Sequence, residues 1–224
     1  TAQLDRPQKG ISFLLFDLDN PGIEVRPLIS ISGDHEFNQI FFENARVPAS
    51  GLLGEENDGW TVAKYLLQHE RGGSYATWLK VKIGQLRDFA KTEQAGTGDV
   101  LMDEPDFARK LAAAEIELDV MHAFEQRVAA MAAGGGPVGF ISSANKIRGT
   151  ELRQLVTELA VEAVGYYGLP YQPEVRAYRS NEAPISSSMG ATALPQYLND
   201  RAATIYAGSN EIQRNIISKQ ILGL

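Results

Sequence analysis

The stretch Val62-Ala63-Lys64-Tyr65-Leu66-Leu67-Gln68-His69-Glu70-Arg71-Gly72-Gly73-Ser74 sets one carboxylate into an apolar helical stripe. At four-residue steps, Glu70 follows Val62 and Leu66 on the same helix face. Two adjacent glycines come next, and each costs a helix about 1 kcal/mol relative to alanine. A carboxylate in an apolar stripe needs a partner, a shifted pKa or a chemical role. Either the helix ends at the glycines and leaves Glu70 in a solvated last turn, or it kinks there and Glu70 is functional.

The composition indicates a globular protein of one large domain or two small ones. Of its 224 residues 44% are hydrophobic, and the formal charge is −7. We expect no nucleic-acid or membrane partner, because both surfaces repel an acidic protein and no apolar run approaches the roughly 20 residues that span a bilayer. The chain has no cysteine, which excludes disulfides. We expect no metal site either, because metal-ligand spacing is lacking among His35, His69 and His122.

Residues 1–52 are predicted to form part of an antiparallel β-domain. The apolar run Ile11–Leu18 is closed by turn residues at Asp19–Gly22, and Ile23–Ile29 alternates in polarity. A third strand is expected at Phe37–Asn44, which gives a short meander. Three strands leave both sheet edges unpaired, so we expect further sequence upstream or another chain to complete the sheet.

Residues 53–224 are predicted to form a helical bundle domain, because the hydrophobic period changes from two to nearly four after Leu52-Leu53-Gly54. The first helix is expected to be capped by Asn57 or Asp58 and, if the glycines only kink it, to end near Thr92. Later helices are expected at Asp106–Ala133, Val138–Val164 and Leu194–Leu222, the last interrupted at Gly208–Asn210 after a loop at Tyr167–Ala191. A solvated charged face on the third helix is expected from Arg148, Glu151, Arg153 and Glu158. The fold class is α+β, mostly α, with an antiparallel four-helix bundle.

Three stretches of the chain resemble the acyl-CoA dehydrogenase family. They are residues 33–48 (GDHEFNQIFFENARVP), residues 53–60 (LGEENDGW) running on into His69–Gly72, and residues 203–217 (ATIYAGSNEIQRNII). Their order and spacing carry the resemblance, which covers the whole chain. The chain covers only part of the family's architecture, because an N-terminal helical domain and the first half of the middle β-domain have no counterpart in it.

The resemblance implies an FAD-dependent enzyme that oxidises an acyl-CoA thioester to the trans-2-enoyl-CoA. In the family a carboxylate removes the α-proton while the β-hydrogen leaves as hydride to the flavin. Many members carry this base after the Tyr of the last motif, where this chain has Ala207, which cannot accept a proton. Others, including isovaleryl- and long-chain-type enzymes, carry it on the first bundle helix just before an Arg. Glu70, followed by Arg71, matches that position and is predicted to be the base.

The resemblance also implies binding roles. Positions near the acyl-CoA thioester are matched by Arg71, Tyr206 and Gly208. Positions that contact the flavin are matched by Ser209, Glu211, Gly165 and Tyr166. Each position has a structural alternative, which the residues alone leave open: a surface arginine, a core tyrosine beside a helix break, a helix-capping serine, a surface glutamate or a plain helix C-cap.

Two features depart from the family pattern. Relatives usually carry an Arg-Gln-Phe-Gly motif after the first bundle helix, whose Arg reaches the flavin pyrophosphate of a neighbouring subunit, whereas residues 95–100 read AGTGDV. The turn after the third helix usually has two adjacent glycines, whereas residues 165–168 read GYYG. Both departures resemble a branch that includes bacterial pimeloyl-CoA-type dehydrogenases, some of which work as mixed large and small subunits.

The expectation is therefore a bacterial, cytoplasmic flavoprotein of fatty acid metabolism. It would take an acyl-CoA substrate, pass electrons to an electron-transfer flavoprotein, and work as a homo- or hetero-oligomer, a dimer or a tetramer. Two alternatives remain open. The chain could be a non-catalytic structural subunit of a hetero-oligomer, or part of an acyl-CoA oxidase, in which oxygen reoxidises the flavin.

Overall fold

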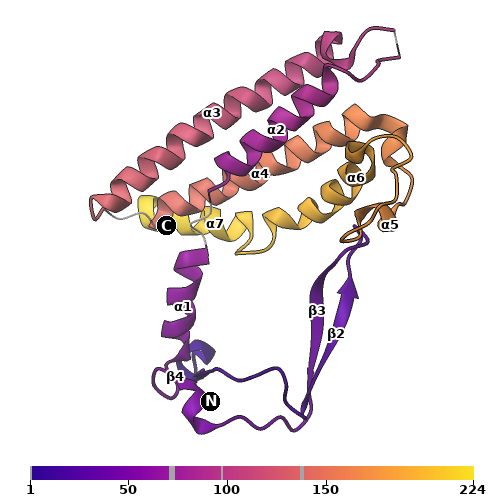
Figure 1. Cartoon of the computed structure of the whole chain (residues 1–224). Helices are drawn as coiled ribbons and strands as arrows, with labels where there is room; N and C mark the ends of the chain where they lie inside the picture. The colour runs from indigo at the N-terminus through magenta and orange to yellow at the C-terminus, as the bar shows by residue number, and fades with distance from the viewer. Residues whose placement is uncertain (1, 71–73, 97, 137–138) are drawn as a thin grey trace. The chain divides into compact units, whose positions relative to one another are not determined.

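The computed structural model describes residues 2–70, 74–96, 98–136 and 139–224, apart from the side chains of residues 68–70, 139 and 140. The chain divides into two compact units (Figure 1). The first comprises Thr1–Ser30 and Asp34–Gly72, and the second comprises Ile31–Gly33 and Gly73–Leu224. The strands belong to the first unit, and the long helices of the bundle belong to the second.

The first unit contains two separate pairs of strands. β2 (Ile23–Ile29) and β3 (His35–Phe42) form an antiparallel hairpin. β1 (Phe13–Leu14) pairs antiparallel with β4 (Leu52–Leu53). The remaining elements are η1 (Pro7–Gly10), η2 (Ala49–Gly51) and α1 (Gly59–Glu70), which packs against β1 and η1. Every residue of β3 is exposed, so the hairpin buries neither of its faces.

The predicted three-stranded meander is wrong. The apolar run Ile11–Leu18 forms ladder hydrogen bonds only at its centre, in β1, and its partner is β4, which was not expected as a strand. β3 also begins and ends two residues before the predicted Phe37–Asn44. The unit includes α1, whereas the expected boundary at residues 52–53 placed this helix in the bundle domain. That boundary stays a prediction about the domains.

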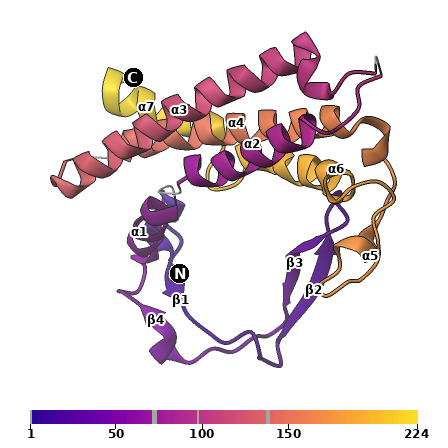
Figure 2. The same cartoon turned by 45° about the horizontal axis from the view of Figure 1, so that its top comes forward.

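The second unit is a helical bundle built around α4 (Gly139–Val164). α4 contacts α2 (Ala76–Ala90), α3 (Pro105–Ala133), α6 (Ser188–Asp200) and α7 (Asn210–Ile217). These helices run side by side in both views (Figure 1, Figure 2). Shorter segments connect or extend them: η3 (Leu101–Asp103), η4 (Gly165–Gly168), α5 (Pro173–Arg176), η5 (Arg201–Thr204) and the π-helical η6 (Ser218–Leu222).

The core lies between α2, α3 and α4, and each helix contributes a stripe at alternating steps of three and four residues. The stripes are Ala76, Leu79, Ile83, Leu86 and Ala90 on α2; Phe107, Leu111, Ala114, Leu118 and Met121 on α3; and Leu152, Val156, Leu159 and Ala163 on α4. This spacing is typical of bundles whose side chains interlock at a crossing angle of about 20°. The apolar pattern thus fixes which face of α4 points to α2 and α3.

The face of α4 toward α6 and α7 is polar instead. Its buried polar residues are Ser143, Lys146, Thr150 and Thr157. Gln154 donates its side-chain amide to the backbone oxygens of Asp200 (3.0 Å) and Arg201 (3.2 Å), and Arg201 donates back to the Gln154 carbonyl at 3.0 Å. Side-chain hydrogen bonds therefore join α4 to the α6–α7 segment, and this polar interface carries the candidate site.

The fold class, α+β and mostly α, is confirmed, and two helix boundaries differ from those expected. Of the two alternatives for the first helix, the continuous run to Thr92 is contradicted, because Ser74 and Tyr75 are not helical and α2 begins at Ala76, while Gly72 and Gly73 lie outside the described residues. The expected last helix begins earlier, at Ser188, because Ser187 caps it by accepting the Gly190 N–H at 3.0 Å. The bundle is thus formed by α2, α3, α4 and the α6–α7 pair.

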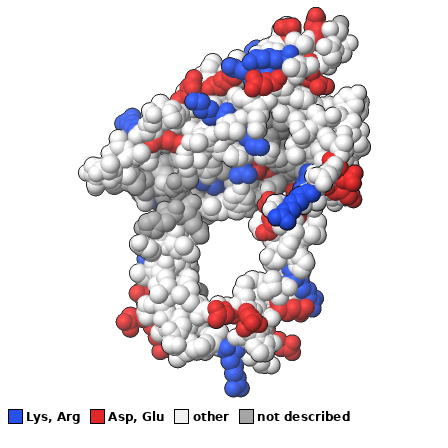
Figure 3. Space-filling model, in the orientation of Figure 1, with Lys and Arg blue, Asp and Glu red and all other residues white. Residues whose placement is uncertain are grey.

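The surface of the bundle mixes charges of both signs. Figure 3 shows Lys and Arg side chains next to Asp and Glu side chains over its visible face. Lys110, for example, contacts both Asp106 (2.7 Å) and Glu162 (2.8 Å). Exposed pairs of this kind contribute little to stability. Within the described part of the chain, no helix is long and apolar enough to cross a membrane.

Candidate active site

The candidate site centres on a strained turn, residues 206–209, between η5 and α7. Ala207 (φ 54°) and Gly208 (φ 80°) both adopt the left-handed conformation. This region is strained for a residue with a Cβ, and such strain clusters at functional sites. The turn brings together Tyr206, Gly208 and Ser209, three residues that the sequence predicted to bind substrate or cofactor.

Gln213 holds this turn in place from within the bundle. Its side chain is fully buried, and its Nε2 donates to the backbone oxygens of Ala207 (3.3 Å) and Gly208 (3.1 Å). A Cβ at Gly208 would lie 2.5 Å from that same Nε2 atom. The left-handed backbone and the close approach of Gln213 together require glycine at position 208.

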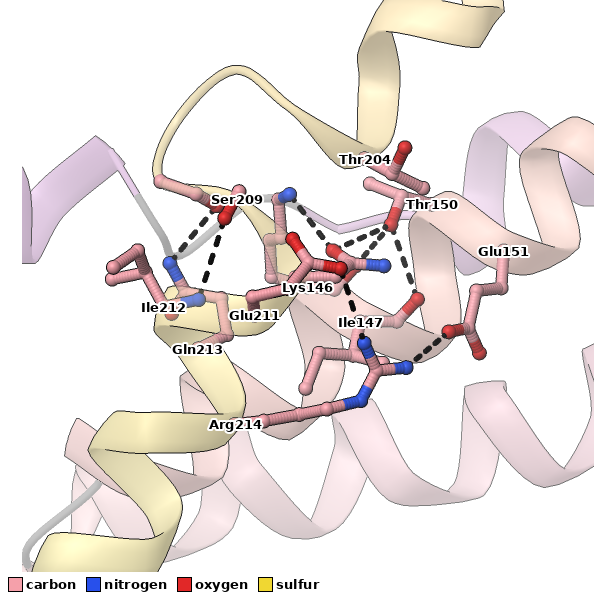
Figure 4. Close-up of polar contacts among 12 residues, drawn as sticks. Lys146, Ile147, Thr150, Glu151, Thr204, Ser209, Glu211, Ile212, Gln213 and Arg214 are labelled. Carbon is pink, nitrogen blue, oxygen red and sulfur yellow. Dashed lines mark hydrogen bonds and ion pairs between the residues drawn. The ribbon is translucent and has the colours of Figure 1, made fainter.

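A buried polar cluster lies under the start of α7 (Figure 4). Lys146, 1% exposed, donates from Nζ to Asn210 Oδ1 at 2.9 Å, and Thr150 donates to the same oxygen at 3.3 Å. Burial lowers the pKa of Lys146, because desolvation disfavours the ammonium, and the charge of Glu211 opposes this shift. The cluster anchors the first residue of α7 to α4.

Ser209 and Glu211 are occupied within the chain. Ser209 caps α7, because its hydroxyl accepts the Ile212 N–H at 3.4 Å. The pKa of Glu211 is lowered by a hydrogen bond from its own backbone N–H, by the Ser209 hydroxyl, and by the charges of Arg214 and Lys146. Arg214 reaches Glu151 at 2.8 Å and Glu211 at 3.8 Å, as Figure 4 shows. An ionised carboxylate thus sits at the exposed N-terminus of α7.

A second cluster joins Tyr206 to α2, α4 and α6. Arg153 of α4 donates from Nη1 to the Tyr206 hydroxyl at 3.3 Å, and its Nη2 lies 2.5 Å from Asp200 Oδ1. The guanidinium also lies over the Trp78 ring, 4.9 Å from its centroid. Burial alone would lower the pKa of Arg153, but the hydrogen bond and charge of Asp200 outweigh this and raise it. Tyr75 lies near this cluster. The pKa of Tyr75 is raised, chiefly by desolvation and also by the neighbouring Tyr206.

Gly165 and Tyr166 lie elsewhere, at the far end of α4. Gly165 has a φ of 52° and no atom within 4 Å of an added Cβ, and the Tyr166 side chain is largely exposed. At a rise of about 1.5 Å per residue, Gly165 is roughly 28 Å along the helix from Lys146. The structure therefore brings Tyr206, Gly208, Ser209 and Glu211 together but places Gly165 and Tyr166 apart from them.

The predicted base lies at the end of α1. Glu70 is the last residue of α1, and its side chain lies outside the described residues. Arg71 also lies outside them. The roles of both residues therefore stay predictions from the sequence.

Several residues of the site were not predicted from the sequence. Arg153 was expected on a solvated face, but its side chain is only 27% exposed, because it pairs with the buried Asp200. Arg148 does lie on that face, with a side chain 60% exposed. The signal that could have found Lys146 and Asp200 is a charged residue inside an otherwise uncharged helix face. In the described ranges, no group of three His, Asp or Glu side chains could hold a metal ion.

A cavity of about 540 Å³ lies between α2, α4 and α6. Trp78 and Thr157 line it, together with Met189 from α6. A separate cavity of about 340 Å³ lies beside η4, where the one charged residue among the described lining is Glu93. None of the described residues predicted to bind substrate or cofactor lines either cavity.

Comparison with known proteins gives one consistent family. Residues 57–222 match the family model described as acyl-CoA dehydrogenase, C-terminal domain. The chain is 33% identical over 218 residues to acyl-CoA dehydrogenase IpdE1 of Mycobacterium tuberculosis, covering 96% of this chain and 51% of that protein. It is 32% identical to IpdE1 of Mycolicibacterium smegmatis, covering 100% of this chain and 52% of that protein. The chain thus spans about half the length of these curated relatives.

Solved structures agree with this fold. The ChsE4–ChsE5 complex from Mycobacterium tuberculosis is 25% identical with a TM-score of 0.79, covering 98% of this chain and 55% of the matched chain. An acyl-CoA dehydrogenase from Geobacillus kaustophilus is 26% identical with a TM-score of 0.77, covering 99% and 55%. The family match extends over every helix of the bundle and over the strained turn before α7. The chain therefore belongs to the acyl-CoA dehydrogenase family and carries its C-terminal domain.

Proposed function

We propose that this chain is part of an FAD-dependent acyl-CoA dehydrogenase that converts an acyl-CoA thioester to the trans-2-enoyl-CoA. The family match over residues 57–222 carries the proposal, and the chain's site residues add a specific mechanism to it. Ala207 stands at the position where many members carry the base, and its methyl group accepts no proton. The base is then Glu70, which takes the proton from the substrate α-carbon.

Glu70 has to be ionised to act as the base. A carboxylate is a stronger base when it is desolvated, because burial raises its pKa toward the operating pH. The position of Glu70 supports this role, because the residue stands in register with Val62 and Leu66 at the end of α1. On this proposal Tyr206 and Gly208 line the thioester region, and Arg71 lies near the acyl-CoA.

The residues predicted to contact FAD fit it at one place better than at the other. At the start of α7, Ser209 caps the helix and the carboxylate of Glu211 has Arg214 3.8 Å away, so a cation offsets its negative charge beside a bound ligand. Near Gly165 and Tyr166, the cavity beside η4 has only the acidic Glu93 as a charged lining residue in the described part of the chain. A carboxylate there disfavours a pyrophosphate. When bound, FAD would supply the acceptor for the β-hydrogen, and we assign its contact in this chain to Ser209 and Glu211.

A second candidate function is that of a subunit in a hetero-oligomeric acyl-CoA dehydrogenase whose partner completes the flavin site. The cavity beside η4 favours this function. Its described lining contains Glu93 but no cation that could pair with the pyrophosphate of a neighbouring flavin. The similarity to the ChsE4–ChsE5 complex agrees with such an assembly. Homo- and hetero-oligomers, with electron-transfer flavoprotein as the electron acceptor, both fit the proposed reaction.

The test uses the complete natural protein that contains this chain. Its flavin content is measured after purification, and a panel of acyl-CoAs is offered with an artificial electron acceptor, with and without oxygen. Formation of enoyl-CoA by a flavin-containing protein supports the dehydrogenase. A flavin-loaded protein that produces no enoyl-CoA from any acyl-CoA contradicts it, and a flavin-free protein that becomes active only with a second subunit identifies the hetero-oligomer.

A further inference from the structure

Arg153 links the strained turn to three other parts of the bundle. It lies on α4, and its guanidinium contacts Tyr206 before the turn, Asp200 at the end of α6 and Trp78 on α2. Lys82 of α2 also lies near the Trp78 ring, 5.7 Å from its centroid. One side chain thus contacts residues from α2, α6 and the segment that leads into the turn.

The geometry gives Arg153 little freedom to move. Asp200 is fully buried, so its carboxylate needs the guanidinium as its counter-charge. The planar guanidinium also stacks on the indole face of Trp78, a geometry that an ammonium group does not reproduce. Ion pair and stacking together fix the Nη1 atom, and Nη1 is the atom that donates to Tyr206.

This hydrogen bond determines which way the Tyr206 hydroxyl points. The hydroxyl oxygen accepts from Arg153, so its own proton is left to donate in another direction. Tyr206 is 42% exposed, so a ligand can approach the residue from solvent. We propose that Arg153 is a positioning residue that orients the Tyr206 hydroxyl as a hydrogen-bond donor to the bound acyl-CoA. The inference rests on the proposed function, because it assigns Tyr206 to the substrate.

A purely structural role for Arg153, as the partner of Asp200, is the competing explanation. Replacing Arg153 by an apolar residue would not separate the two, because it leaves Asp200 buried without a counter-charge. Arg153→Lys does separate them. The ammonium keeps a positive charge beside Asp200, but it lacks the fork that reaches both Asp200 and Tyr206. Tyr206→Phe removes only the hydroxyl, and Arg148→Lys, at an exposed position on the same helix, is the matched control.

The experiment is a double-mutant cycle on the complete flavin-loaded protein. The substrate is the acyl-CoA that bleaches the wild-type flavin fastest among straight-chain and cyclic acyl-CoAs. Arg153→Lys and Tyr206→Phe are each expected to raise KM about fivefold, the effect of one lost hydrogen bond, with kcat changed less than twofold. The double variant is expected to be no worse than either single variant, and Arg148→Lys is expected to match the wild type.

Additive losses in the double variant would overturn the inference, because the two side chains would then act independently. An Arg153→Lys effect that persists unchanged in the Tyr206→Phe background would show the structural role instead. Failure of the proposed function looks different: no acyl-CoA would bleach the wild-type flavin, and the inference would fall with it. A wild type that reacts, together with an additive cycle, removes only the role of Arg153.

Discussion

The carboxylate of Glu125 on α3 accepts the backbone N–H of Tyr75 at 2.6 Å and thereby caps α2 from a neighbouring helix. The same carboxylate accepts the Ala76 N–H at 3.3 Å and the Ser74 hydroxyl at 2.8 Å. α2 has no side-chain cap of its own at Tyr75. The helix that follows the predicted base therefore begins where a tertiary contact satisfies its free N–H groups.

Removing this cap is expected to destabilise the bundle. Glu125→Ala should lower the free energy of unfolding by about 1–2 kcal/mol, the usual cost of a lost N-cap. Glu117→Ala is the matched control on the same helix, because Glu117 pairs with Arg148 at the surface, and it should cost less than about 0.5 kcal/mol. Urea unfolding of the two variants checks this, and equal effects would contradict the capping role.

Replacing either of two glycines of the bundle by alanine is expected to change the stability of the protein, in opposite directions at the two positions. Gly208→Ala should destabilise by roughly 1–3 kcal/mol, because the left-handed backbone is strained and the new Cβ would meet Gln213 at 2.5 Å. Gly84→Ala, inside α2 with nothing within 4 Å of the added Cβ, should stabilise by about 0.5–1 kcal/mol. Thermal unfolding measures both. A neutral Gly208→Ala would show that Gln213 does not hold the turn.

The buried Lys146 predicts a pH dependence of stability. Burial lowers its pKa in the folded protein, so between that pKa and the ordinary lysine pKa of 10.5 the unfolded chain binds more protons. The free energy of unfolding contributed by Lys146 therefore rises with pH across this window. Urea unfolding of the wild type and of Lys146→Met is measured from neutral pH to pH 10.5. The free energy of unfolding of the wild type should rise with pH relative to that of the variant. Parallel curves would contradict a desolvated ammonium.

The 224-residue chain by itself is expected to be colourless and to lack dehydrogenase activity. Its predicted flavin contacts form two groups: Ser209 and Glu211 lie at the start of α7, where Asn210 binds Lys146, and Gly165 and Tyr166 lie roughly 28 Å from Lys146 along α4. One flavin site therefore needs further chain or another subunit. The exposed hairpin residues Phe37, Ile40 and Phe42 should also promote self-association. Absorbance and size-exclusion chromatography check this, and stoichiometric bound flavin in the isolated chain would refute it.

The sequence was a good guide to the bundle because its helices carry regular apolar stripes. The stripes predicted α3 to within one residue at each end and the end of α4 at Val164, while the predicted start of α4 at Val138 lies outside the described residues. The start of α2 and the pairing of β1 with β4 could not be predicted, because both depend on partners far along the chain. The site also depends on distant partners. The motif indicated Tyr206 and Ser209, but the role of Arg153 depends on the buried Asp200, which the sequence around Arg153 does not show.

Glu70 is the residue on which the proposed mechanism depends. Gln at position 70 keeps nearly the same shape but accepts no proton, so the loss should fall on chemistry and not on binding. In the Glu70→Gln background, Ala207→Glu should restore part of the activity, because that position carries the base in many relatives. Without recovery, the turn before α7 does not face the same α-carbon as Glu70.

The most direct test is anaerobic stopped-flow measurement of flavin bleaching by acyl-CoA in the complete protein, wild type against Glu70→Gln. We predict that the variant keeps its bound flavin and loses bleaching by a factor of about 10² or more, as expected for a missing general base. Bleaching at the wild-type rate in Glu70→Gln would contradict the assignment of Glu70 as the base.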